Sequence, residues 1–235
     1  LAGLEQPHTA LGILMLVAAT VLLTAFVRHC RRAENSLLDL YLFAHPVFCA
    51  AACTQFLLNG AIIATQVLIP LYFVHATGRS PADVGWMLAP LGTGMLGAFI
   101  CMGSLPARLG SRSVAVAGAL LASTGMCLFI LLSDIDSSTD LPMLALLLVG
   151  AGQGAIGVPS TTAAYTSIEK KRLPMAATTL NVVQRLGGPL MATVCAQLLA
   201  WHLAVEPQSS GPYLHSLWML VLLHILCAIT ALRLK

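Results

Sequence analysis

Long apolar stretches, separated by short charged segments, follow one another along the chain. They lack the alternation of β-strands, and each has the roughly 20 residues that a helix needs to cross the hydrocarbon core of a bilayer. The pattern therefore predicts an all-α, polytopic membrane protein. Its seven predicted transmembrane helices cover residues 9–27, 46–74, 83–104, 113–133, 141–166, 174–203 and 212–232.

The amino-acid composition also indicates a membrane environment. Hydrophobic residues make up 58% of the 235 residues and charged residues only 9%, whereas a soluble domain carries about 25% charged residues. Such a chain cannot cover itself with a polar shell, so we expect the lipid bilayer to surround most of it. The small net charge of +3 gives no reason to expect a nucleic-acid partner.

Basic residues are concentrated in alternate loops, which hold ten of the twelve Lys and Arg. The positive-inside rule places such loops on the cytoplasmic side. We therefore predict a multi-pass protein of the plasma or inner membrane, with the amino end of this chain outside and the carboxyl terminus in the cytoplasm. The basic residues of the cytoplasmic loops are Arg28, Arg31, Arg32, Arg108, Arg112, Lys170, Lys171, Arg172, Arg233 and Lys235.

The first predicted span carries its positive cluster after it and no basic residue before it, the reverse of a signal peptide. An outside start without a signal is easiest to explain if earlier spans precede it. We therefore expect the chain to be the carboxyl-terminal part of a longer membrane protein.

Polar side chains are concentrated on three of the predicted spans, 46–74, 141–166 and 174–203. The sequence predicts that these side chains line a shared substrate path, with the span 83–104 assisting. The alternative is that each amide only joins two helices. The spans 113–133 and 212–232 look like supporting helices because they carry few polar groups apart from His224. The predicted path residues are Gln55, Asn59, Gln66, Gln153, Asn181, Gln184 and Arg185.

Arg185 is the most informative of these residues because it is the one fixed charge deep within a predicted span. An arginine at a helix centre costs about 2.5–3.5 kcal/mol on insertion scales, so it rarely faces lipid. It either reaches the cytoplasmic interface with its long side chain or points inward. We favour the inward position, opposite a polar partner or an anionic group of a substrate.

Four prolines within or beside these spans are predicted to break helices, since proline cannot donate a backbone hydrogen bond. They are Pro70, Pro90, Pro159 and Pro189.

Several kinds of chemistry find no support in the sequence. It contains no HExxH, no GxxxxGK[ST] and no CxxC pair, so we expect no metal site, no cofactor and no enzymatic activity. No Asp or Glu lies inside any span, so an acid that couples protons to transport is expected elsewhere. A free-standing seven-span receptor is a weaker alternative, because neither a DRY-like triplet nor NPxxY is present. A non-functional transporter fragment is another alternative.

Four segments resemble the 14-span drug:proton antiporters of the major facilitator superfamily, the EmrB/QacA-like group. These segments follow in the family's order, and the resemblance runs over nearly the whole chain. They are "LLDLYLF" (37–43), "LIPLYFVHATGRSPADVGWMLAPLGTGMLG" (68–97), "GSLPARLGSRS" (103–113) and "LNVVQRLGGPL" (180–190).

The resemblance implies a six-helix carboxyl-terminal bundle at 37–235, preceded by one extra helix and a cytoplasmic linker at 1–36. It implies proton-driven efflux of small amphipathic or cationic compounds by alternating access, together with the amino-terminal half of the same transporter. Gly103, Arg108, Gly110 and Arg112 match the family's gating loop, although Ala107 replaces its Asp.

Overall fold

A computed structural model of the protein describes residues 21, 40–102, 105–135, 140–205 and 211–234, and none of these residues is in a strand. The chain divides into two compact units, Leu1–Tyr41 and Leu42–Lys235. Six helical segments of the second unit are long and apolar enough to span a membrane. They correspond to the second through seventh predicted spans. The first predicted span, 9–27, lies outside the described residues apart from Val21.

The six membrane-spanning segments differ in how regular they are. The first joins α2 (Pro46–Leu71) to the π-helix η2 (Tyr72–Ala76), and the second joins α3 (Pro81–Met87) to α4 (Ala89–Cys101). The fifth joins η3 (Lys170–Arg172) to α8 (Leu173–Val205), and the other three are single helices. The remaining elements are η1 (Leu40–Ala44), α5 (Leu105–Leu109), α6 (Ser111–Ile135), α7 (Asp140–Thr166) and α9 (Gly211–Ala231).

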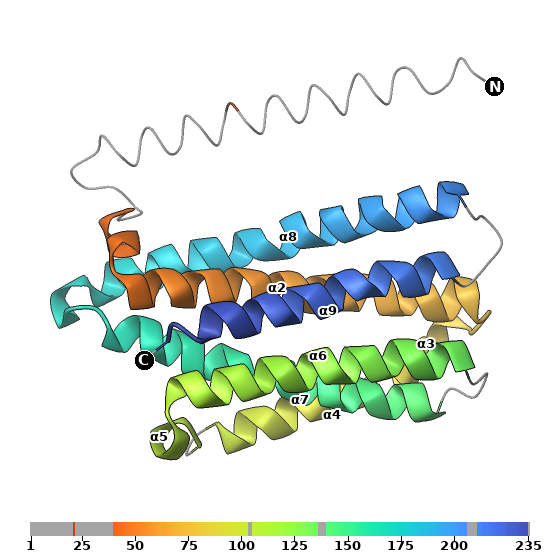
Figure 1. The fold of residues 1–235 in the computed structure, drawn as a ribbon, viewed down its shortest axis with the longest axis horizontal. Helices are drawn as coiled ribbons and strands as arrows, with labels where there is room; N and C mark the ends of the chain where they lie inside the picture. The colour runs from red at the N-terminus through yellow and green to blue at the C-terminus, as the bar shows by residue number, and fades with distance from the viewer. Residues whose placement is uncertain (1–20, 22–39, 103–104, 136–139, 206–210, 235) are drawn as a thin grey trace. The chain divides into compact units, whose positions relative to one another are not determined.

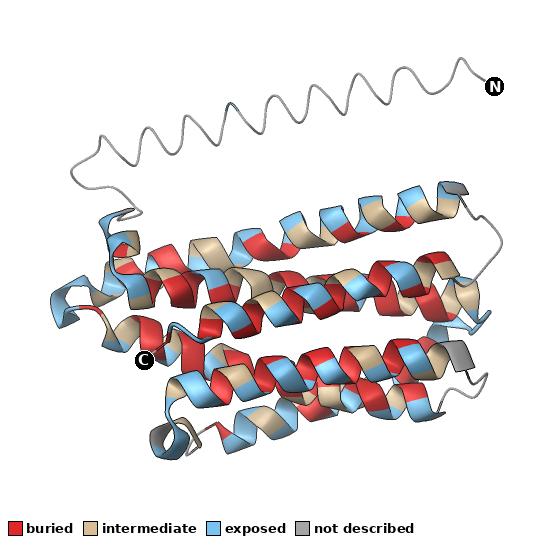
Figure 2. Ribbon diagram, in the orientation of Figure 1, coloured by how far each residue is buried: buried red, intermediate tan, exposed pale blue. Residues whose placement is uncertain are grey.

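The long helices of the second unit lie lengthwise beside one another (Figure 1). Helix α7 packs against α6 and α4, α2 packs against α8, α9 and α7, and α6 packs against α9. Helices α4 and α8 therefore form the two margins of the bundle, and α2 and α7 lie between them. These two marginal helices are also the least buried of the six spans (Figure 2).

Glycines allow the marginal helices to approach their partners closely. A Cβ at Gly187 of α8 would collide with the backbone carbonyl of Phe56 in α2, and a Cβ at Gly150 of α7 would collide with the carbonyl of Leu91 in α4. Small residues at such crossings are typical of membrane helices, whose association depends on van der Waals packing rather than on the hydrophobic effect.

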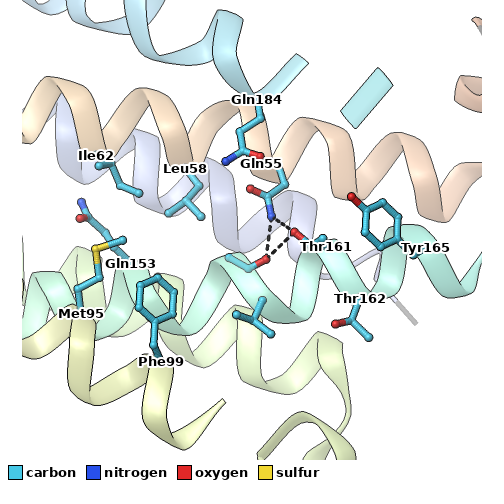
Figure 3. A pocket seen from close by; sticks show the side chains of 12 residues that line it. Gln55, Leu58, Ile62, Met95, Phe99, Gln153, Thr161, Thr162, Tyr165 and Gln184 are labelled. Carbon is cyan, nitrogen blue, oxygen red and sulfur yellow. Dashed lines mark hydrogen bonds between the residues drawn. The ribbon is translucent and has the colours of Figure 1, made fainter. Parts of the chain in front are cut away.

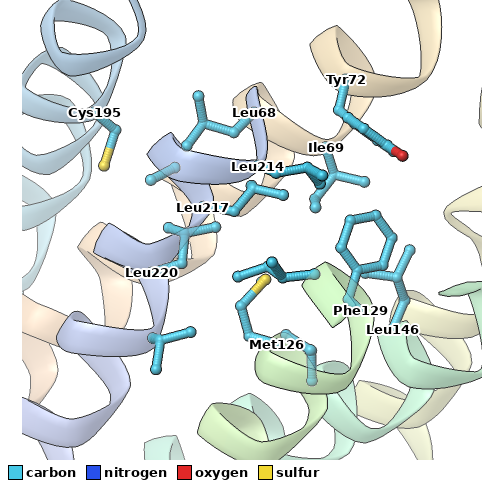
Figure 4. Packing of buried hydrophobic residues seen from close by; sticks show 14 of the residues in the cluster. Leu68, Ile69, Tyr72, Met126, Phe129, Leu146, Cys195, Leu214, Leu217 and Leu220 are labelled. Carbon is cyan, nitrogen blue, oxygen red and sulfur yellow. The ribbon is translucent and has the colours of Figure 1, made fainter. Parts of the chain in front are cut away.

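A large apolar core fills the bundle near the end of α2 (Figure 4). Leu68 and Ile69 of α2 meet Leu217 and Leu220 of α9 in the same cluster, and Phe129 of α6 is completely buried there. The Phe129 ring lies edge-on to the rings of Tyr72 and Phe73, with centroids 5.8 and 5.9 Å away. This geometry is favourable for aromatic pairs, so η2 is fixed to α6.

The four prolines have different local surroundings. Helix α2 ends at Leu71, the residue after Pro70, and the π-helix η2 follows it, whereas α4 begins with Pro90 in its first turn. Helices α7 and α8, by contrast, run on through Pro159 and Pro189. At these two positions the proline removes one backbone hydrogen bond without ending the helix.

Candidate functional site

Two neighbouring cavities lie among α2, α4, α7 and α8, a set of helices that includes both marginal helices. The larger, of about 480 Å³, is lined by residues of α2, α4, α7 and α8, and the smaller, of about 470 Å³, by residues of α2 and α8. Gln184 of α8 borders both of them. Volumes of this size suit small organic molecules.

Gln55 forms one polar side of the larger cavity, although its side chain is only 2% exposed. Its amide nitrogen lies 2.7 Å from the carbonyl oxygen of Gly157, 2.9 Å from Ser160 Oγ and 2.6 Å from Thr161 Oγ1. Figure 3 shows this nitrogen directed at Thr161 across the gap between α2 and α7. The amide therefore joins these two helices beside the cavity.

Gln153 of α7 forms a second polar side and is also 2% exposed. Its amide nitrogen lies 3.4 Å from Thr65 Oγ1 of α2 and 3.2 Å from Nε2 of His224 in α9. His224 is completely buried, and its Nδ1 lies 2.7 Å from the carbonyl oxygen of Leu220. Gln153 thus links three helices at one point of the cavity wall.

Apolar side chains cover much of the remaining wall of the larger cavity. Leu58 and Ile62 come from α2, and Met95 and Phe99 from α4 (Figure 3). Tyr165 of α7 lines it as well, at a distance along the helix from Gln153. A molecule inside would meet flexible and aromatic surfaces with a few polar points, as is usual in small-molecule sites.

Arg185 lines the smaller cavity and is exposed at the surface of the bundle. It makes no hydrogen bond or ion pair within the part of the chain that the structure describes. Asn59 contributes from α2, and Asn181 lies one helical turn before Arg185 and donates its amide proton to the carbonyl oxygen of Ala177 at 3.0 Å. The smaller cavity therefore carries a fixed positive charge without a described counter-charge.

The predicted gating loop lies between α4 and α6, and none of its described residues lines either cavity. Gly110 separates α5 from α6 with a φ of +82°, in the left-handed region that glycine adopts without strain. Arg108 and Arg112 flank it and are exposed. Gly103 lies outside the described residues.

The cavities bring together most of the residues that the sequence predicts for a substrate path. Gln55, Gln153 and Gln184 line the larger cavity. Asn59, Asn181 and Arg185 line the smaller one together with Gln184. Gln66 is exposed and lines neither cavity. The polar stripe of α2 is therefore used over only part of its length.

Several contributors escape prediction from the sequence. Met95 and Phe99 read as ordinary apolar positions, because lipid-facing and cavity-facing residues look alike in a membrane helix. His224 did carry a signal, since an ionisable side chain inside a span points to function by default. The scarcity of other polar groups on its helix concealed that signal.

The residues that the structure describes contain no group of three or more His, Cys, Asp or Glu side chains that could hold a metal ion. The side chains that line the two cavities supply amide, hydroxyl, guanidinium and apolar groups.

Six packed helices that are long and apolar enough to cross a bilayer define an integral membrane protein. Residues 7–192 match the sequence model of the Major Facilitator Superfamily. The chain belongs to this superfamily, which confirms the family predicted from the four sequence segments.

The chain is similar to several proteins named for drug efflux or resistance. It is 29% identical over 174 residues to the drug efflux pump JefA of Mycobacterium tuberculosis (strain ATCC 25618 / H37Rv), covering 74% of this chain and 34% of that protein. It is 28% identical over 188 residues to the multidrug resistance protein Stp of the same strain (80% and 35%). It is 28% identical over 187 residues to the lincomycin resistance protein of Streptomyces lincolnensis (79% and 38%). The chain thus spans between 34% and 38% of the length of these relatives.

Proposed function

We propose that this chain forms the carboxyl-terminal bundle of a secondary transporter that exports small amphipathic or cationic compounds. The observation that carries the proposal is the pair of cavities among α2, α4, α7 and α8, which combine amide groups, apolar side chains and one arginine. The names of the relatives, which refer to drug efflux and to lincomycin resistance, support export as the direction.

Alternating access is the mechanism that we propose for this transport. The proposal includes a second bundle that covers the exposed sides of α4 and α8, because the chain spans about a third of its relatives and these two helices are the least buried spans. The cavities would then lie at the interface of two bundles, where transporters of this kind bind their substrates.

Proton coupling is also part of the proposal. No Asp or Glu occurs within 46–76, 89–101, 113–133, 141–166, 170–204 or 211–231. A carboxylate in the transport path is the usual proton carrier of such proteins. We therefore propose that the coupling acid belongs to the second bundle, and that these helices mainly bind substrate.

Replacing Arg185 tests the proposed path. The protein, expressed from its own gene, is assayed for efflux of a fluorescent amphipathic dye from membrane vesicles in which a pH gradient is imposed. We expect Arg185→Ala to slow efflux at least tenfold, because the smaller cavity loses its one fixed charge, while Arg185→Lys retains part of the activity. The amount of protein in the membrane should stay the same in both variants.

Arg233→Ala is the matched control, because it removes a positive charge after α9 and away from both cavities. It should leave the efflux rate unchanged. If Arg185→Ala transports as fast as the wild-type protein, Arg185 does not belong to the path. If the wild-type protein does not move the dye, with or without the gradient, the proposed export itself is wrong for that substrate class.

A further inference from the structure

We infer that the larger cavity binds apolar or aromatic molecules through N–H or O–H groups that the molecule itself carries. The cavity would then discriminate against close analogues that can only accept hydrogen bonds. This inference rests on the proposed function, because it treats the larger cavity as the substrate site, and it names the class of substrate that the site prefers. It follows from the direction of the hydrogen bonds that hold Gln55 and Gln153.

Two backbone carbonyls fix the orientation of the Gln153 amide indirectly, through the side chains of His224 and Thr65 that they hold. The carbonyl of Leu220 can only accept, so Nδ1 of His224 carries the proton that joins them at 2.7 Å. In the neutral ring, Nε2 is then an acceptor. The side-chain atom of Gln153 that faces it at 3.2 Å must therefore be the nitrogen.

Thr65 leads to the same orientation from another side. Its hydroxyl donates to the carbonyl oxygen of Ala61 at 2.7 Å, so its oxygen is left to accept from the Gln153 nitrogen at 3.4 Å. Both N–H groups of Gln153 are then directed at protein acceptors, one on α2 and one on α9. Turning the amide over would place its oxygen against the lone pairs of His224 Nε2.

The directions of the neighbouring hydrogen bonds also fix the orientation of the Gln55 amide. The Gly157 carbonyl, 2.7 Å away, can only accept, so the Gln55 atom that faces it is the amide nitrogen. Ser160 and Thr161 donate their own hydroxyl protons to carbonyl oxygens of α7, at 2.7 Å to Ile156 and 3.0 Å to Gly157. Both hydroxyl oxygens can therefore only accept from Gln55, which meets three acceptors with two N–H groups.

The side-chain carbonyl oxygens of Gln55 and Gln153 remain as hydrogen-bond acceptors, because the N–H groups of both amides are already directed at protein acceptors. No described residue donates to Oε1 of Gln55 or of Gln153. Among the described residues, the fully buried side-chain atoms that lack a hydrogen-bond partner are Ser133 Oγ and Thr179 Oγ1. The Gln55 and Gln153 oxygens lack a partner but are not in this group, so neither of them is fully buried. Both glutamines line the larger cavity, and we assign to it these two oxygens as acceptors whose direction is set by the fold.

The rest of the lining does not reverse this preference. Thr162, Tyr165 and Gln184 can each donate or accept, because no described residue fixes the hydroxyl protons or the Gln184 amide. Leu58, Ile62, Met95 and Phe99 offer no strong donor. A ligand that only accepts would leave the two fixed oxygens without a partner in a largely apolar cavity, which is unfavourable. A ligand with N–H or O–H groups satisfies them.

The test is equilibrium binding of 1-naphthol and of its methyl ether to the purified 235-residue chain in lipid nanodiscs, followed by naphthalene fluorescence. The two compounds share the aromatic body and differ in the single O–H. We expect naphthol to bind about fivefold more tightly, the effect of one neutral hydrogen bond. The ether is the more apolar compound, so a preference for naphthol cannot come from partitioning into lipid.

Variants then assign the preference to the two amides. The double variant Gln55→Met and Gln153→Met should reduce the affinity ratio to about one. His224→Phe should lower the ratio partway, because the Gln153 amide loses one of the acceptors that orient it although His224 does not line the cavity. Gln197→Met is the matched control, since Gln197 is an exposed glutamine of α8 outside both cavities. It should leave the ratio at its wild-type value.

Equal binding of the two compounds to the wild-type chain, or no measurable binding of either, overturns the inference without need of any variant. A preference for naphthol that survives the double variant also overturns it. The efflux assay is independent of these results. Transport with equal binding refutes the donor preference alone, and a clear preference without transport refutes the proposed function alone.

Discussion

The contact between α8 and α2 gives a prediction whose magnitude can be worked out from the structure. Gly187→Ala adds a methyl group that would collide with the backbone carbonyl of Phe56. A backbone atom in a helix cannot turn aside as the end of a side chain can. Overpacking of this kind costs about 1–3 kcal/mol, while the gain in helix propensity from glycine to alanine is about 1 kcal/mol.

Gly97→Ala in α4 is the control that isolates the collision. Gly97 also lies inside a helix, but a Cβ there would meet no atom within 4 Å. Both variants share the gain in helix propensity, so their difference in unfolding free energy should be the overpacking cost of about 1–3 kcal/mol. Gly97→Ala should be the more stable of the two.

The assay is reversible unfolding in mixed detergent and SDS micelles, followed by tryptophan fluorescence. Trp201 lies on α8 and reports on the helix that the collision would displace. If Gly187→Ala is as stable as Gly97→Ala, then α8 does not approach α2 as closely as the structure has it. The shape of the smaller cavity, whose walls are α2 and α8, would then have to be reconsidered as well.

Two further predictions concern the core and the orientation. Phe129→Ala should lower the unfolding free energy by about 3–5 kcal/mol, because Phe129 is completely buried among aromatic rings. Phe99→Ala, at a 45% exposed position, should cost much less, and equal costs in the same unfolding assay would contradict the packing. In a cysteine-free background, Lys171→Cys should react with a membrane-impermeant maleimide in inverted vesicles and Arg79→Cys in intact cells, because the positive-inside rule places their loops on opposite sides; the reverse pattern of labelling would refute the proposed orientation.

Helix number and length follow from the sequence because the bilayer imposes them. A run such as 141–166 must be a membrane helix whatever it packs against, since its backbone groups find no partner in lipid except within the helix. The partner of that helix is not predictable in the same way. Lipid and protein core are both apolar, so the composition of α7 does not tell which of its sides faces α6.

The polar residues show the same limit. Gln55 and Gln66 belong to one stripe of α2 in the sequence, yet Gln55 is buried against α7 and Gln66 is exposed. The difference arises because Gly157, Ser160 and Thr161 offer acceptors to Gln55. Those residues lie about a hundred positions further along the chain. Their approach is decided by helix packing, which local sequence pattern does not encode.

The glycine contacts at the two marginal helices have a consequence for motion. Where Gly187 lies against Phe56 and Gly150 against Leu91, backbone meets backbone, and at these points no side chain interlocks the surfaces. Between α4 and α7 the other crossing glycine of α7, Gly154, meets only backbone atoms of Met95 and the methyl group of Ala98, so these two helices can shift along each other by small shear movements. The contact of α8 with α2 is different, because the Met191 side chain packs over Gly60 and interlocks the two helices. Helix α4 can thus slide on α7 while the hydrogen bonds of Gln55 and Gln153 between α2, α7 and α9 stay intact. The width of the larger cavity, which α4 lines, would then change while the direction of the Gln55 and Gln153 oxygens does not.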